Sequence, residues 1–257
     1  MHYFNSFDTI NSVNNYKLKK IHYDTILLSD IHFGSPSCHA QELYAFLNNI
    51  KVRQIIFNGD VFDGLNFYRL QHWDWEAFGQ IRKISDHCQV IWCRGNHDEV
   101  NTKLMSSLLG VRVQSEYQWE FQGRRFLALH GDKWDVFIYR YRLLTKIVTW
   151  IYTRIQYASK GYSRKIAQWL KKKSKAMIRN SEIIRKNAVR VAENRRFHGV
   201  FCGHTHAVEL IKSGQIIYGN CGTWESDLPH FIGLNKSGVS LLKFCNNKVT
   251  VCVCEKF

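Results

Sequence analysis

The sequence has none of the long apolar runs that would place the protein across a membrane. No stretch of about 18 uncharged apolar residues occurs, so no segment is predicted to span a bilayer. The first twenty residues are polar and rich in Asn, and they lack the apolar core of a signal peptide. We therefore expect a cytoplasmic protein with a polar N-terminal tail, residues 1–20.

Cysteine pairs at metal-binding spacing are also missing. The chain has eight cysteines, but no two of them form a CxxC pair. Four lie in apolar, strand-like runs, namely Cys93, Cys202, Cys252 and Cys254. A reduced thiol in such a run serves as a small core residue. A metal site built on thiolates is therefore not expected.

Acidic residues are scarce in one region only. Residues 133–198 contain 18 lysines and arginines but only three acids, Asp135, Glu182 and Glu193, so this segment has a net charge of +15. The whole chain has the same net charge, +15, and the remainder is therefore balanced. A localised positive charge of this size predicts contact with a polyanion, either an anionic membrane surface or nucleic acid.

The basic segment also has a helical apolar pattern, which is interrupted near Gly161. Apolar residues such as Phe137 and Tyr141 recur at helical spacing in its first half, and a stripe that includes Ile184 and Ala188 follows in its second half. Two interpretations remain open. The segment is either an ordinary helical hairpin with a solvated basic face or a lid whose apolar surface binds a hydrophobic ligand.

Five short apolar stretches each end in side chains that bind divalent metals. Small residues beside them allow the chain to turn sharply at these points. In an open α/β sheet, ligands bind at the carboxyl ends of the strands, so we expect these side chains to gather at one edge. Asp, Asn and His without thiolate suit Mn²⁺, Fe or Zn²⁺. The five stretches end in Asp30-Ile31-His32, Asn58-Gly59-Asp60, Gly95-Asn96-His97-Asp98, His130-Gly131-Asp132 and Gly203-His204-Thr205-His206.

Strands and helices alternate in the first half of the chain, and hairpins follow in the last part. Residues 41–50 and 75–84 are expected to form crossover helices between parallel strands. The predicted fold class is α/β, with two mixed β-sheets sandwiched together, flanked by helices, and a helical-hairpin insertion over the active site. The predicted hairpins pair residues 209–211 with 216–218 and 239–244 with 249–254. The predicted core comprises residues 21–132 and 199–257, and the insertion comprises residues 133–198.

The order of the five motifs resembles the calcineurin-like metallophosphoesterase superfamily. D-x-H, G-D-x-x-D, G-N-H-D, H-G-D and G-H-T-H follow one another between residues 30 and 206. The motif spacing and residues 130–135 (HGDKWD) more narrowly resemble the bacterial UDP-2,3-diacylglucosamine hydrolase family of lipid A synthesis. The best-known members of that family have Arg where this chain has His97, which is the residue that the wider superfamily uses.

The resemblance implies two divalent metal ions, with Mn²⁺ expected first and Fe or Zn²⁺ as alternatives. Asp60 would bridge them, so that both ions act on one phosphoryl group. One ion would be held by Asp30, His32 and His206, and the other by Asn96, His130 and His204. The expected catalytic residues are His97, which would stabilise charge or protonate the leaving group, and Asp98, which like Asp63 could orient a histidine. The expected substrate contacts are Asn96, His97, Asp135 and His204.

Three functions remain open at this point. The first is hydrolysis of the diphosphate bond in a nucleotide-linked glycolipid of the UDP-diacylglucosamine type, by an enzyme held on the cytoplasmic face of the inner membrane through residues 133–198. The second is a nuclease or phosphodiesterase that acts on nucleic acid or on a soluble nucleotide. The aromatic residues of the basic segment lie in apolar helical runs and form no base-stacking platform, which favours the lipid. The third is a protein phosphatase.

Overall fold

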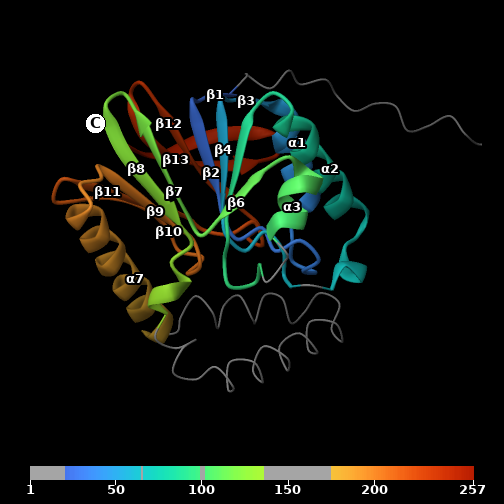
Figure 1. Cartoon of the computed structure of the whole chain (residues 1–257), viewed down its shortest axis with the longest axis horizontal. Helices are drawn as coiled ribbons and strands as arrows, with labels where there is room; N and C mark the ends of the chain where they lie inside the picture. Colours follow the sequence, from blue (N-terminus) through green and yellow to red (C-terminus); the bar gives the residue numbers. More distant parts are fainter. Residues whose placement is uncertain (1–20, 65, 99–101, 136–174) are drawn as a thin grey trace, which may run out of the picture.

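The computed structural model describes residues 21–64, 66–98, 102–135 and 175–257 of the chain. Two β-sheets lie face to face at its centre, and helices cover their outer faces (Figure 1). The predicted α/β class, with two mixed sheets flanked by helices, is therefore confirmed. The expected polar tail, residues 1–20, lies outside the described residues.

One sheet has seven strands, in the order β14-β13-β12-β2-β4-β5-β6. The strands β2, β4, β5 and β6 run parallel, while β12, β13 and β14 are antiparallel to their neighbours. Every residue of β2 and β4 is buried, as expected for parallel strands that are covered on both faces. The bounds are Thr25–Leu28 for β2, Gln54–Asn58 for β4, Gln89–Cys93 for β5, Arg112–Gln114 for β6, His230–Asn235 for β12, Gly238–Cys245 for β13 and Lys248–Glu255 for β14.

Helices α1 and α2 pack on the outer face of the seven-stranded sheet, with α3 beside them (Figure 1). The helix α1 confirms the crossover helix expected over residues 41–50, and it buries Leu43, Phe46 and Leu47. The helix α2 begins earlier than expected, because Gln71 and Asp74 form a capping box at its start. The bounds are Ala40–Asn49 for α1, His72–Ser85 for α2, Thr102–Leu109 for α3 and Phe67–Arg69 for the short 3₁₀ helix η1.

The second sheet has five strands, in the order β10-β11-β9-β8-β7. The strands β8, β9 and β11 run parallel, whereas β7 and β10 are antiparallel edge strands. Both expected hairpins form, β10 with β11 and β13 with β14. The bounds are Glu116–Phe121 for β7, Arg124–Leu129 for β8, Gly199–Cys202 for β9, Val208–Ser213 for β10 and Ile216–Cys221 for β11; β1 (Ile21–His22) and β3 (Ile50–Lys51) form a separate parallel pair.

The helix α7 (Lys175–Asn194) covers the outer face of the five-stranded sheet (Figure 1). Ile184 and Ala188 of its apolar stripe are fully buried in a cluster that includes Leu129 of β8. From its sequence, this part of the chain was expected to belong to the lid, but its packing makes it a helix of the core. Residues 136–174 of the predicted insertion lie outside the described residues.

The cysteines are all free, and they divide into two groups by burial. Cys93 and Cys202 are buried, as expected for core thiols. Cys252 and Cys254 are exposed, so the core-thiol prediction was wrong for these two. The reason is that β14 is the edge strand of its sheet and most of its side chains remain uncovered.

Candidate metal centre

The predicted metal ligands lie where the carboxyl ends of strands from both sheets meet. Asp30, Asp60 and Asn96 follow β2, β4 and β5 of the seven-stranded sheet. His130 and His204 follow β8 and β9 of the five-stranded sheet. The sequence pattern predicted that these side chains gather at one edge, and the structure forms that edge from two sheets.

Asn58, the last residue of β4, ties the two sheets together at this edge. Its Nδ2 donates to the backbone oxygen of Leu129 at 3.2 Å and to that of Phe201 at 3.0 Å. Its own carbonyl oxygen lies 3.0 Å from Nδ1 of His130. These contacts fix the ends of β8 and β9 beside β4. Asn58 was named only as part of the Asn58-Gly59-Asp60 motif and no role was predicted for it, although a polar residue at the end of a buried apolar strand was a usable signal.

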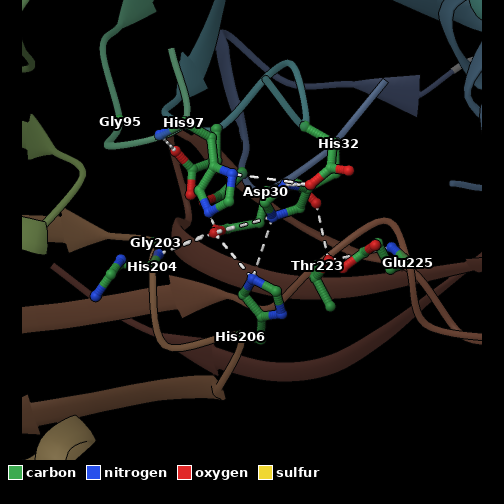
Figure 2. A network of polar contacts seen from close by, with 12 residues as sticks. Asp30, His32, Gly95, His97, Gly203, His204, His206, Thr223 and Glu225 are labelled. Carbon is green, nitrogen blue, oxygen red and sulfur yellow. Dashed lines mark hydrogen bonds and ion pairs between the residues drawn. The ribbon is translucent and has the colours of Figure 1, made fainter. Parts of the chain in front are cut away.

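Asp30, His32 and His206 form one compact group (Figure 2). Nε2 of His206 lies 3.2 Å from Oδ1 of Asp30 and 3.3 Å from Nε2 of His32. Thr223, a further residue that sequence analysis missed, donates to the backbone oxygen of Asp30 at 2.8 Å. Two ring nitrogens and a carboxylate oxygen thus converge on one place, which is a ligand set that suits a divalent transition metal.

Asp60, His130 and His204 form a second group. Oδ2 of Asp60 lies 3.1 Å from Nε2 of His130, and the rings of His130 and His204 meet edge to face with centroids 5.2 Å apart. Asp60 also interacts electrostatically with His32 of the first group. A carboxylate placed between the two groups is what a bridging ligand requires.

Asn96 lies beside the second group. Its neighbour Gly95 packs so closely against Asp60 that a β-carbon would overlap the carboxylate. Its other neighbour, His97, donates its backbone N–H to Oδ1 of Asp60 at 2.8 Å. The structure therefore brings all seven predicted ligands to one region, six of them in the two groups and Asn96 next to them.

The backbone is strained at five of these residues. The φ angles of Asp30, His32, Asp60, His204 and His206 lie between 50° and 66°, in the left-handed region that non-glycine residues avoid. Such strain is maintained only where the surrounding structure enforces it, and it clusters at functional sites. The backbone is thus held in an unfavourable conformation at these ligand positions.

One buried candidate ligand atom, Oδ1 of Asn96, has no hydrogen-bond partner among the described residues. A buried polar atom without a partner normally carries a cost of desolvation, and a bound ion satisfies it. Together with the composition of the two groups, this atom fits a dinuclear divalent-metal site.

Charge coupling within the site is strong. Burial acts to raise the pKa of Asp60, but the nearby His130, His97 and His32 hold it well below its ordinary value. Burial acts to lower the pKa of His130, but the Asp60 carboxylate, with Asp30 and Asp132, raises it to about 10. The carboxylate of Asp60 is therefore ionised at neutral pH, as a metal ligand must be.

His97 lies at the open side of the site. Its side chain is 33% exposed, whereas that of His32 is only 6% exposed. Nδ1 of His97 and Nδ1 of His32 each lie 3.8 Å from Oδ1 of Asp63, which is itself paired with Arg69. Asp63 is therefore the carboxylate that is placed to orient a histidine. His32, Asp63 and His97 are also close enough to one another to hold an ion.

Asp98 lies beneath the site and is fully buried. Its Oδ1 accepts hydrogen bonds from the backbone N–H groups of Val61 and Phe62. Its Oδ2 accepts one from the backbone N–H of Gly95 and one from the indole N–H of Trp92. Burial, reinforced by the charge of Asp60, raises the pKa of Asp98 to about 6. These hydrogen bonds hold the Asp60 and Asn96 loops together, and none of them reaches the histidines that Asp98 was expected to orient.

Asp135 is joined to the second group. Its Oδ2 lies 2.7 Å from Nε2 of His204 and accepts a hydrogen bond from Nδ2 of Asn180 at 2.9 Å. From the sequence, Asp135 was expected to contact the substrate. In the structure this carboxylate is buried, and it contacts a predicted metal ligand.

A family model for calcineurin-like phosphoesterases matches residues 24–208. This range contains both groups of candidate ligands, from Asp30 to His206. A search of curated proteins found no match.

Solved structures match this chain at low sequence identity. A double mutant of Vps29 from Entamoeba histolytica has a TM-score of 0.51 and 13% identity, over 91% of this chain and 98% of that chain. Yfce, a phosphoesterase from E. coli, has a TM-score of 0.49 and 12% identity, over 90% of this chain and 99% of that chain. The similarity to Vps29 shows the fold alone.

Proposed function

The chain belongs to the calcineurin-like phosphoesterase family, and we propose that it cleaves the diphosphate bond of a nucleotide-linked glycolipid of the UDP-diacylglucosamine type. The coarser activity, metal-dependent phosphoester hydrolysis, follows from the family and from the two ligand groups. The observation that carries it is the convergence of Asp60 with both groups at the meeting point of the two sheets.

We assign the ligands as the sequence motifs predicted. One ion would be held by Asp30, His32 and His206. The other ion would be held by Asn96, His130 and His204, and Asp60 would bind both ions. Two bound divalent ions, with Mn²⁺ proposed first, would neutralise the phosphate charge and lower the pKa of the attacking water. The strained backbone at five of these residues and the partnerless buried Oδ1 of Asn96 support the assignment.

The chain's own residues would then position the phosphoryl group. His97, at the open side, would donate a hydrogen bond to a phosphate oxygen or a proton to the leaving group. Asp63 would hold the ring of His97 in place, because its Oδ1 lies 3.8 Å from Nδ1 of His97 and its Oδ2 is paired with Arg69. The buried Asp98 would keep the loops that carry Asp60 and His97 at a fixed spacing.

A cleft of about 440 Å³ is lined by Gly34, which follows His32 by two positions in the sequence, and by Arg69. We propose that this cleft receives the nucleotide end of the substrate. Arg69 connects the cleft to the metal centre through its ion pair with Asp63. Tyr68 stands on its rim with a fully exposed ring, which offers a flat face to a base.

The lipid end of the substrate is proposed from the basic segment. The net charge of +15 in residues 133–198 falls between the His130 and His204 motifs, so this charge is close to the predicted ligands along the chain. Each basic residue near an anionic membrane contributes about 1 kcal/mol of attraction. No helix in the described ranges is long and apolar enough to cross a membrane. We therefore propose peripheral, salt-releasable association with the cytoplasmic face of the inner membrane.

The test replaces residues 136–174 with a short linker and keeps α7, which the core requires. The variant should hydrolyse a small soluble diester at the wild-type rate but lose vesicle binding and activity on the acylated diphosphate. Charge-reversed substitutions of α7 residues with exposed side chains, such as Lys186→Glu, serve as the matched control for charge alone. Full activity of the linker variant on the acylated substrate would contradict the lipid proposal.

A nuclease is the second candidate, because clustered positive charge also marks binding to a phosphate backbone. A panel of an acylated nucleotide diphosphate, a single-stranded oligonucleotide and a phosphopeptide separates the candidates. We expect the acylated diphosphate to be the best substrate by kcat/KM. Preference for the oligonucleotide, lost in the linker variant, would favour the nuclease, and preference for the phosphopeptide would favour a protein phosphatase.

A further inference from the structure

A buried chain of polar contacts runs from the helix α7 to the second ligand group. Nδ2 of Asn180 donates to Oδ2 of Asp135 at 2.9 Å, and the same oxygen lies 2.7 Å from Nε2 of His204. The side chains of Asp135 and His204 are 9% and 8% exposed, so little water competes for these contacts. Asp135 itself is held by the short 3₁₀ helix η2 (Asp132–Trp134), because its N–H donates to the backbone oxygen of Asp132.

The donors in this chain decide which nitrogen of His204 carries the proton. An ionised carboxylate accepts hydrogen bonds only, and Oδ2 of Asp135 already accepts one from Asn180. Nε2 of His204 must therefore donate, which leaves the lone pair of Nδ1 for the ligand group. The backbone N–H of His204 is also fixed, since it donates to both carboxylate oxygens of Asp30 at 3.1 Å.

We propose that Asp135 is a positioning residue that sets the tautomer of His204, and that Asn180 makes this setting depend on the docking of α7. Metal-binding histidines commonly donate their second N–H to a carboxylate, which fixes the ring and raises its basicity. Here the carboxylate comes from the segment after β8, and the residue that holds it comes from α7. The inference rests on the proposed metal centre and assigns to Asp135 a role other than substrate contact.

The consequence concerns one metal site and not the other. Asp135 contacts His204, and His204 belongs to the group with Asp60 and His130 rather than to the group of Asp30, His32 and His206. Loss of the Asp135 carboxylate should therefore weaken binding of one ion and leave the other close to its original affinity. A merely structural role would weaken both sites together or neither.

The decisive variant is Asp135→Asn, which keeps the shape but can turn an N–H toward Nε2 of His204. That contact would favour a proton on Nδ1, where the metal has to bind. Calorimetric titration of the chelator-treated protein with Mn²⁺ should show one ion bound as in the wild type and the other bound about 10–100-fold more weakly. Asn180→Ala removes one bond to Asp135 and should weaken the same ion about five-fold.

The matched control on α7 is Arg185→Ala. It removes an ion pair between α7 and Glu209 of β10 without touching Asp135 or His204. Both Mn²⁺ affinities of this variant should equal those of the wild type. If Arg185→Ala weakened the same ion as Asn180→Ala did, the effect would come from a general loosening of α7, and the role assigned to the Asn180 hydrogen bond would be overturned.

The wild type alone provides a second test, which holds even where a variant fails to fold. In the Zn²⁺-loaded protein, long-range ¹H–¹⁵N correlation spectra should show His204 protonated at Nε2 and coordinated through Nδ1. A proton on Nδ1 of His204, or two unchanged Mn²⁺ affinities in Asp135→Asn, would overturn the inference. Neither measurement needs hydrolysis, so a protein that binds two ions but cleaves no phosphoester would contradict the proposed function and leave this inference standing.

Discussion

Gly95 and the carboxylate of Asp60 are in such close contact that no side chain fits between them. A β-carbon at residue 95 would stand 2.5 Å from the backbone nitrogen of Asp60 and 2.9 Å from its Cγ. Non-bonded carbon atoms rest at about 3.5–4.0 Å, so one of the two loops would have to move. The glycine of the G-N-H-D motif is therefore a steric requirement of the proposed bridging ligand.

Gly95→Ala should displace Asp60 and weaken metal binding by about 10–100-fold, with a corresponding loss of hydrolysis. The control is Gly79→Ala in α2, where a β-carbon meets no atom within 4 Å. This control should leave metal binding unchanged and stabilise the helix by about 0.5–1 kcal/mol. Metal titration and thermal unfolding of both variants provide the test, and normal Mn²⁺ binding by Gly95→Ala would show that Asp60 is not a ligand.

His97→Ala separates charge stabilisation from metal binding. If His97 stabilises the phosphoryl group, the variant should keep its metal content and lose about 10²–10³ in kcat, the scale of one electrostatic donor. His130→Ala is the comparison, because it removes an assigned ligand and should lose metal. Elemental analysis of both variants decides the matter, and equal metal loss would make His97 a ligand in the group with His32 and Asp63.

The anchoring of α7 should depend on pH through Glu116 of β7. Arg195, just after α7, donates two hydrogen bonds to Glu116, at 2.6 and 3.0 Å, and lowers the pKa of this carboxyl. Because the folded pKa is depressed, the pair stabilises the protein above the unfolded pKa of Glu and loses this effect as pH falls through the folded pKa. Glu116→Gln should cost at most about 1 kcal/mol at pH 7, since the pair is partly exposed.

Urea unfolding of Glu116→Gln and of the wild type between pH 3 and 7 measures this difference. The two unfolding free energies should converge as pH falls below about 4, near the reference pKa of Glu. A difference that stayed constant over the whole range would assign the effect to packing and not to the charge of Glu116.

The ligand positions were predictable from sequence because each depends on a local pattern. A short apolar run followed by Asp60 or His130 fixes both the strand and the side chain at its carboxyl end. The same patterns located β2, β4, β5, β8 and β9, and the predicted hairpins located four more strands. The fold class followed from their alternation with helices.

Contacts between segments far apart in the chain were not predictable in this way. The amide of Asn58 bonds to residues 71 and 143 positions away, and Asp135 meets His204 across 69 positions. No local pattern separates such a carboxylate from a substrate contact, which is why Asp135 was assigned to substrate. The strand β12 and the short helix α3 were missed. The apolar stripe of α7 was recognised, but α7 was assigned to a lid because the pattern does not show that the stripe packs on the five-stranded sheet.

The most direct test of the account counts metal ions and turnover in the same samples. Chelator-treated protein is titrated with Mn²⁺ while bound metal per chain and hydrolysis of an aryl phosphodiester are followed together, with Asp60→Ala in parallel. The account predicts no hydrolysis without metal, full activity at two ions per chain, and a loss of orders of magnitude in Asp60→Ala with the fold intact. Full turnover in the metal-free protein, or ordinary turnover in Asp60→Ala, would contradict it.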